Sequence, residues 1–266
     1  MYMEPAPGPG SRAAPWTEPS RKPVTTGKAQ PKAIEQFKKL LPWECLDTFL
    51  IELEGTDIAL VAPTVGAALI HFDTVVYFVI SMCLETRTMK AQDRARVLEL
   101  WIQVARECNK LRNYSSLHGI VTALKAAPIH SLQETWTAVS RESARAYKEL
   151  CARDDRMTQE KLIKLGISKL ALQEKNPQRA QMRQQRQKGV IPFLGIFLDD
   201  LTLLQKWTQN NVAAFKIIRQ LQLLQVTANN FCFQPDKEFQ SWFQTMKPLD
   251  QYNIHNFSWE LEPPFE

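Results

Sequence analysis

The sequence lacks the short motifs that mark covalent catalysis and nucleotide binding. It has no Gly-x-Ser-x-Gly turn, no His-Glu-x-x-His pair, no phosphate-binding loop and no Gly-x-Gly-x-x-Gly fingerprint. Its four histidines (His71, His118, His130 and His255) lie far apart, and such histidines are more often surface or hydrogen-bonded core residues than ligands. We therefore expect no metal, no cofactor and no covalent chemistry.

Paired cysteines are also missing. The five cysteines are odd in number, scattered, and contain no Cys-x-x-Cys pair: Cys45, Cys83, Cys108, Cys151 and Cys232. This pattern indicates reduced thiols. The first 30 residues show neither a signal-peptide nor a transit-peptide pattern, so we predict a cytoplasmic protein.

Glycine is scarce, whereas apolar residues are plentiful. Only 9 of the 266 residues are glycine and 44% are hydrophobic, and segments with helical periodicity outnumber alternating ones, which predicts an all-α protein. Seven of the 16 prolines fall within the first 31 residues. We expect residues 1–32 to be a disordered Pro-rich tail and residues 33–266 to form one domain, as a monomer.

The net charge of +5 is mild and does not indicate nucleic-acid binding. Basic residues nevertheless gather after position 174, where Arg179, Arg183 and Arg186 would share one helical face between Lys175 and Lys188. A solvated face is the first interpretation. The alternative is a contact with anionic lipid or with an acidic partner.

The most hydrophobic segment runs from residue 62 to residue 84, with a helix start predicted at Pro63. It is long enough to cross a membrane, but His71 and Asp73 lie in its middle, where a charge is costly. We interpret it as the central buried helix of a globular bundle and predict no integral membrane segment.

The clearest amphipathic helix is predicted over residues 89–112. Its apolar stripe, continued one step toward the N-terminus, reaches Arg94, which is either a snorkelling surface arginine or a contact residue. Asn113 is suited to the left-handed position that ends this helix. A further helix stops before Pro128, and Ser131 is predicted to cap another one that runs to Leu150.

Residues 189–225 hold the segment around which the chain is organised. An apolar run leads through Pro192, Phe193 and Gly195 into helical spacing of Phe197, Leu198, Leu201 and Leu204. Proline fixes the angle at which the chain enters this helix. A last amphipathic helix is expected over residues 239–246.

Eight short motifs follow one another along the chain, at residues 37–39, 42–46, 62–65, 93–97, 113–116, 126–132, 135–136 and 190–195. Taken in this order, they resemble the Cdc25-homology (RasGEF) domain of Ras-family guanine-nucleotide exchange factors. Within that family the chain most resembles the Ral guanine nucleotide dissociation stimulators. It resembles their short Ral-GDS-related branch in particular, which shares a segment like residues 176–179.

The resemblance implies an all-helical domain that binds a small GTPase, here Ral, and stimulates GDP release through a helical hairpin that begins near Gly195. Arg94, Asn113 and Phe193 match residues that contact or support the second switch of the GTPase. On the hairpin, Leu201, Thr202, Gln205 and Lys206 match GTPase-binding positions. The resemblance predicts that Arg94→Ala or Asn113→Ala weakens GTPase binding and leaves the thermal midpoint nearly unchanged.

The chain departs from the family pattern at the hairpin. Thr202 stands where an apolar wedge residue is usual, and Gln205 or Lys206 stands where Ras activators carry an acidic one. Only residues 206–216 precede the next family segment, about ten fewer than in relatives, which removes roughly 7 Å of reach at ~1.5 Å per residue over two arms. Two hypotheses follow: an exchange factor without covalent chemistry, or a non-catalytic GTPase-binding or scaffold protein.

Overall fold

In the part of the chain that the structure describes, every regular element is a helix, which confirms the all-α prediction. The computed structural model describes residues 31–48, 57–185, 187–207, 211–231, 241, 243, 245 and 247–263. The expected tail over residues 1–30, Arg186, Cys232 and most of the helix predicted over residues 239–246 lie outside these ranges. The helices are α1 (Pro31–Lys39), α3 (Ile58–Val61), α4 (Pro63–Leu84), α5 (Ala91–Lys110), α6 (Tyr114–Lys125), α7 (Ala127–His130), α8 (Gln133–Ala138), α9 (Arg141–Asp154), α10 (Gln159–Gly166), α11 (Lys169–Gln173), α12 (Pro177–Gln184), α13 (Gly195–Trp207), α14 (Asn211–Ala228) and α16 (Gln251–Leu261).

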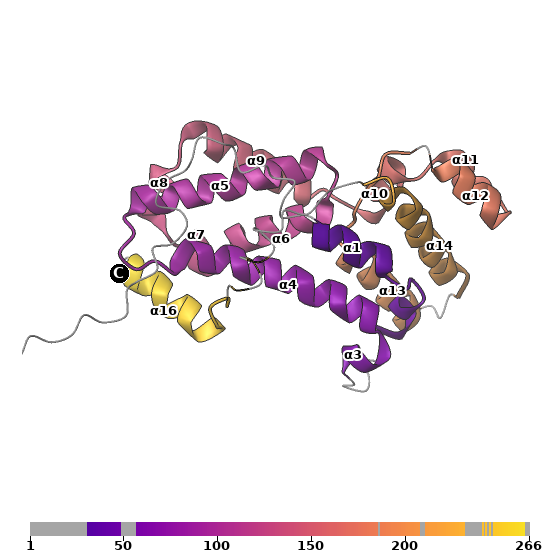
Figure 1. The fold of residues 1–266 in the computed structure, drawn as a ribbon, viewed down its shortest axis with the longest axis horizontal. Helices are drawn as coiled ribbons and strands as arrows, with labels where there is room; N and C mark the ends of the chain where they lie inside the picture. The colour runs from indigo at the N-terminus through magenta and orange to yellow at the C-terminus, as the bar shows by residue number, and fades with distance from the viewer. Residues whose placement is uncertain are drawn as a thin grey trace, which may run out of the picture.

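The central helix is α4, as the sequence predicts. It begins at Pro63 in the first helical position and contacts α1, α3, α5, α6, α7 and α16 (Figure 1). Within the described residues it is also the helix long and apolar enough to cross a membrane, with a mean hydropathy of 1.8, although core helices of soluble proteins pass the same test. Its contacts on several sides are those of a core helix.

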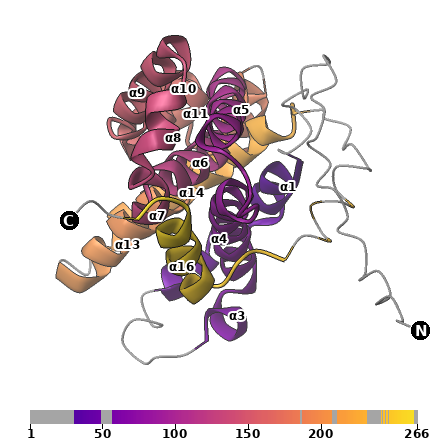
Figure 2. The ribbon, with the colours of Figure 1, turned by 90° about the vertical axis from the view of Figure 1, so that its left-hand side faces the viewer.

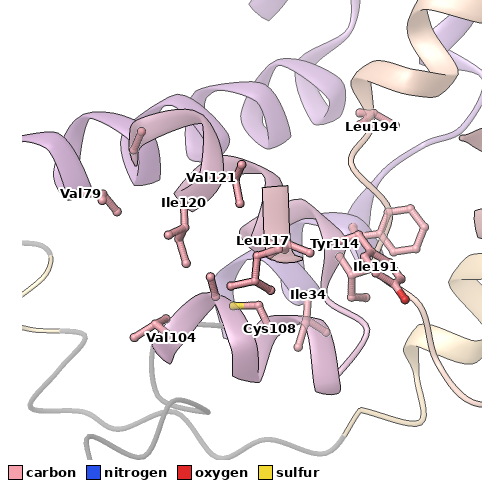
Figure 3. Close-up of a cluster of buried hydrophobic side chains, with 14 of the residues drawn as sticks. Ile34, Val79, Val104, Cys108, Tyr114, Leu117, Ile120, Val121, Ile191 and Leu194 are labelled. Carbon is pink, nitrogen blue, oxygen red and sulfur yellow. The ribbon is translucent and has the colours of Figure 1, made fainter. Parts of the chain in front are cut away.

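The core lies where α6 is held between α4 and α5. Figure 3 shows Leu117, Ile120 and Val121 of α6 directed into the space between these two helices. Val79 of α4 and Val104 and Cys108 of α5 complete this part of the core. The i, i+3, i+4 spacing of the α6 residues therefore gives one continuous buried face.

The cysteines that the structure describes form no disulfide bond with one another. Cys45, Cys83 and Cys108 are buried, and Cys151 is partly exposed. Burial, the largest cause, raises the pKa of Cys45 and of Cys83 to about 12. These two thiols therefore stay protonated and behave as small apolar side chains.

Two local predictions were wrong, and one helix was missed. The left-handed residue after α5 is Arg112, with φ 59°, while Asn113 caps the next helix instead of ending the previous one. The long helix expected from Ser131 to Leu150 is two helices, because Val139 turns extended and Ser140 caps α9. The sequence reasoning also missed α16, whose N-cap Asp250 accepts a hydrogen bond from the Asn253 amide.

Candidate functional site

The site is built on the junction between residues 190–194 and the turn that separates α5 from α6. A short parallel bridge joins Asn113 and Ile191: the Ile191 amide donates to the Arg112 carbonyl at 3.0 Å, and the Ile191 carbonyl accepts from the Tyr114 amide at 2.9 Å. Val190 and Ile191 are buried. The backbone that leads into α13 is therefore fixed to the centre of the domain.

Asn113 holds this turn from inside. Its side chain is completely buried, accepts from the Ser116 amide at 3.1 Å and donates to Ser116 Oγ at 2.9 Å. This is an N-cap interaction, which satisfies one of the free amides at the start of α6. Asn113 thus has the geometry of a residue that supports the bridge to Ile191.

Phe193 lies partly exposed at the start of α13, in a cluster of three rings. Its ring centroid lies 4.1 Å from that of His118 on α6 and 4.8 Å from that of Phe72 on α4. Nδ1 of His118 lies 2.9 Å from a carboxylate oxygen of Asp154 on α9. A Cβ at position 195 would lie 2.5 Å from the Phe193 ring, so a larger residue than glycine there would displace this ring.

A small cavity lies beside this cluster and is lined in part by Phe72, Phe193 and His71. His71 is buried, and among the residues described neither of its ring nitrogens has a hydrogen-bond partner. Burial first, and the positive charge of Lys32 second, lower its pKa to about 4. His71 is therefore neutral near neutral pH. Among the described residues, no group of three or more His, Cys, Asp and Glu side chains could hold a metal ion.

The helical hairpin consists of α13 and α14, which pack against each other. α13 has 13 residues and is about 20 Å long at ~1.5 Å per residue. Figure 2 shows it extending outward from the body of the domain. The side chains predicted to bind the GTPase differ in exposure: Leu201 is fully buried, Thr202 and Gln205 are half-buried, and Lys206 is exposed.

These exposures separate anchoring residues from presented ones. Buried Leu201 anchors α13 on the body of the domain. The side-chain Nε2 of Gln205 donates a hydrogen bond to the Leu46 carbonyl at 3.0 Å. Thr202 and Lys206 lie one turn apart on the same helix, at i and i+4. Of the predicted hairpin residues, these two are the most available to a partner.

Three uncovered apolar side chains near the end of this hairpin were missed by the sequence reasoning. Leu203 on α13 and Val212 and Phe215 on α14 are 54%, 81% and 64% exposed. Leu203 falls outside the Phe197, Leu201, Leu204 stripe, which is the signal that could have identified it. Apolar side chains grouped on a projecting element mark a contact surface.

Arg94 lies in the first turn of α5, and its hydrogen bonds reach Thr135 on α8 and Glu262, the residue after α16. It is only 4% exposed, so its interpretation as a snorkelling surface arginine was wrong. Its guanidinium donates to Glu262 at 2.7 Å, to Thr135 Oγ1 at 3.0 Å and to the Met89 carbonyl. All three guanidinium nitrogens of Arg94 therefore donate hydrogen bonds within the domain.

The Glu262 carboxylate completes that cluster by capping α8. The carboxylate accepts hydrogen bonds from the backbone amides of Glu134 and Thr135 and from the Thr135 hydroxyl. These groups lie at the start of α8, where the N-cap residue Leu132 has no side-chain acceptor of its own. Burial raises the pKa of Glu262, but the hydrogen bonds from Thr135, Arg94 and the two amides outweigh burial and lower it. Arg94 and Glu262 therefore join α5, α8 and the segment after α16.

Comparison with known proteins places this arrangement in a family. The model of the RasGEF domain matches residues 33–231. The chain is similar to the human Ral-GDS-related protein, at 42% identity over 240 residues that cover 86% of this chain and 50% of that protein. It is also similar to Ral guanine nucleotide dissociation stimulator-like 1 from mouse, at 34% identity over 85% of this chain and 33% of that protein.

A third relative is human Ral guanine nucleotide dissociation stimulator-like 2, at 31% identity over 86% of this chain and 33% of that protein. The chain thus spans half the length of the first of these relatives and a third of the other two. The residues that match the RasGEF model begin within α1 and continue past the end of α14.

Proposed function

The chain belongs to the RasGEF domain family, and from that premise we propose that it stimulates GDP release from a Ras-family small GTPase of the Ral type. The names of the relatives, Ral-GDS-related protein and Ral guanine nucleotide dissociation stimulator-like 1 and 2, support Ral as the partner. Nucleotide exchange makes and breaks no covalent bond in the chain. We expect the protein to work in the cytoplasm.

The observation that carries this proposal is the projecting hairpin with its uncovered apolar end. Leu203, Val212 and Phe215 remain exposed on α13 and α14 while Leu201 fixes α13 to the body. Covering one such side chain contributes about 1.5–3 kcal/mol. A GTPase surface that covered all three would supply several kcal/mol at the element that enters the nucleotide site.

That binding energy acts by stabilising one state of the partner over another. A chain that binds nucleotide-free Ral more tightly than GDP-bound Ral must, by reciprocity, lower the affinity of Ral for GDP by the same factor. A preference of about 1.4 kcal/mol corresponds to a tenfold loss of GDP affinity. The hairpin therefore needs a differential contact, and binding alone does not release nucleotide.

The predicted site residues take different parts in this proposal. Phe193, partly exposed in its ring cluster, contacts the second switch, while buried Asn113 positions the backbone that carries it. Thr202 and Lys206 contact the GTPase from the hairpin. Leu201 and Gln205 position the helix. Arg94 supports the domain from a distance, through its ion pair with Glu262.

A second candidate function is GTPase binding without exchange. The short hairpin favours it, because α13 ends at Trp207 and α14 begins at Asn211, so the two arms are joined within a few residues. Thr202 stands where the family pattern uses a hydrocarbon, and Gln205 or Lys206 stands where that pattern uses an anion. A hairpin that binds the switch regions without reaching the nucleotide would sequester the GTPase or act as a scaffold.

The test is the release rate of a fluorescent GDP analogue from purified Ral, with Ras and Rap alongside, in the presence of the full chain. We expect acceleration on Ral and a loss of about tenfold or more with Phe215→Ala, since ~1.5–3 kcal/mol of burial is removed. The matched control is Tyr252→Ala, which removes an aromatic side chain of similar exposure on α16. No acceleration on any GTPase, with binding to nucleotide-free Ral retained, would replace exchange by the second function.

A further inference from the structure

The net charge of the protein is concentrated in one segment. Residues 169–188 contain six basic side chains and one acidic one, which gives +5, and the whole chain also carries +5. The remainder of the chain is therefore formally neutral. This segment is α11, α12 and the residues that follow, and it lies at one end of the long axis of the molecule, beside α14 (Figure 1).

Small residues hold this helix pair to the domain. Ala171 of α11 and Ala180 of α12 are buried, and the two helices pack against each other. From α14, Arg219 donates to the carbonyls of Ala171 and Glu174. Gln184 accepts from the Ser168 amide at 2.8 Å. The inner side of the pair is therefore fixed, and its long side chains lie outside.

The single acidic residue of the segment does not compensate the outer charges. Glu174 is largely buried and is paired with Arg183 at 3.1 Å. Lys169, Lys175, Arg179 and Lys188 are exposed, and no ion pair to an acidic side chain is found for them among the residues described. These four positive charges thus face solvent without an acidic partner from the described part of the chain.

Two large apolar side chains lie among these charges. Leu170 and Met182 are 61% and 59% exposed. Arg183 donates to the Leu170 carbonyl at 3.4 Å, so the start of α11 lies beside the end of α12. Arg179 and Met182 follow at i, i+3 on one face of α12. The outer side of the pair is a basic surface with an apolar centre.

We propose that this surface, defined by Lys169, Leu170, Lys175, Arg179, Met182 and Lys188, binds the face of an anionic lipid bilayer. The basic side chains meet the headgroups, and Leu170 and Met182 enter the boundary with the acyl chains. A basic residue near an anionic membrane raises partitioning about fivefold. The segment contains no aromatic residue on which a nucleic-acid base could stack, which argues against single-stranded nucleic acid. The proposal rests on no part of the exchange function.

The experiment is co-sedimentation of the full chain with vesicles of phosphatidylcholine alone and of a two-to-one mixture of phosphatidylcholine and phosphatidylserine. Binding to the mixed vesicles only is expected. The double variant Lys175→Gln, Arg179→Gln should lower that partitioning roughly 25-fold. The matched control Arg145→Gln, Lys148→Gln removes the same charge from exposed positions on α9 and should change it little. All four positions are exposed, so both variants should keep the wild-type thermal midpoint.

A second pair of variants tests the apolar centre. Leu170→Ser with Met182→Ser should weaken binding at every salt concentration and leave the slope of its salt dependence unchanged, because no charge is lost. The proposal would be overturned if the α12-side variant and the α9 control variant lost vesicle partitioning equally, or if the wild-type chain did not bind mixed vesicles. Binding to a polyglutamate peptide without binding to mixed vesicles would also overturn it, in favour of an acidic protein partner.

Discussion

Replacing Arg94 by alanine should destabilise the domain. The substitution leaves the Glu262 carboxylate buried without its cation, and removing one partner of a buried pair costs about 3–5 kcal/mol. For a domain of this size each kcal/mol lowers the thermal midpoint by roughly 2–4 °C, so a loss of about 6–20 °C is expected. The original expectation of an unchanged midpoint assumed an accessible arginine.

The assay is thermal unfolding followed by circular dichroism, with Arg96→Ala as the matched control. Arg96 is on the same helix, but it is exposed and paired with Asp93 at 3.3 Å on the surface. Surface pairs contribute about 0–1 kcal/mol, so the control should shift the midpoint by no more than a few degrees. The same two variants should be compared in GTPase binding.

A double-mutant cycle isolates the ion pair. Arg94→Ala combined with Glu262→Gln should cost less than the sum of the single variants by ~1–3 kcal/mol, because the two groups act together. A midpoint within about 2 °C of wild type for Arg94→Ala, with GTPase binding lost, would refute the reasoning and make Arg94 a contact residue.

Four further outcomes are expected. Stability should fall as the pH drops below 4.5 through the lowered pKa of Glu262, since the stabilisation is present only while this carboxylate is ionised, and Glu262→Gln should flatten that part of the unfolding profile. Asn113→Ala removes a buried cap and should cost ~1–2 kcal/mol by chemical denaturation, so the nearly unchanged midpoint that the family resemblance predicted is no longer expected. Gly195→Ala should displace the Phe193 ring and weaken GTPase binding measured by calorimetry, whereas Gly119→Ala, with ordinary contacts for its Cβ, should not. If the short hairpin reaches the nucleotide, the double variant Thr202→Leu, Lys206→Glu should raise the rate of GDP release about tenfold, because it lowers the activation free energy by ~1.4 kcal/mol. An unchanged rate would favour the scaffold function.

The helices were predictable because their apolar residues repeat locally. The helix predicted over residues 89–112 has an apolar stripe that includes Trp101, Val104 and Cys108. This stripe and the proline start of α4 depend on neighbours a few residues away, and the structure confirms both. The break at Ser140 was missed, because the apolar spacing that includes Trp136 and Tyr147 suggested one helix from Ser131 to Leu150, whereas the rings of these two residues stack across the turn.

The site was predictable as a segment but not as a geometry. The environment of Arg94 depends on Glu262, which lies 168 residues away, and no local pattern can show such a partner. Asn113 similarly owes its burial to the bridge with Ile191. The exposure of Val212 and Phe215 depends on how α14 packs on α13, which the periodicity of either helix leaves open.

The most direct test of the central claim is the affinity of Ral for GDP, measured by equilibrium titration with and without saturating chain. An exchange factor must bind nucleotide-free Ral more tightly than GDP-bound Ral, so saturating chain should weaken GDP binding by about tenfold or more. An unchanged GDP affinity, with the chain shown to be bound to Ral in the same sample, would contradict the exchange function and leave a GTPase-binding scaffold.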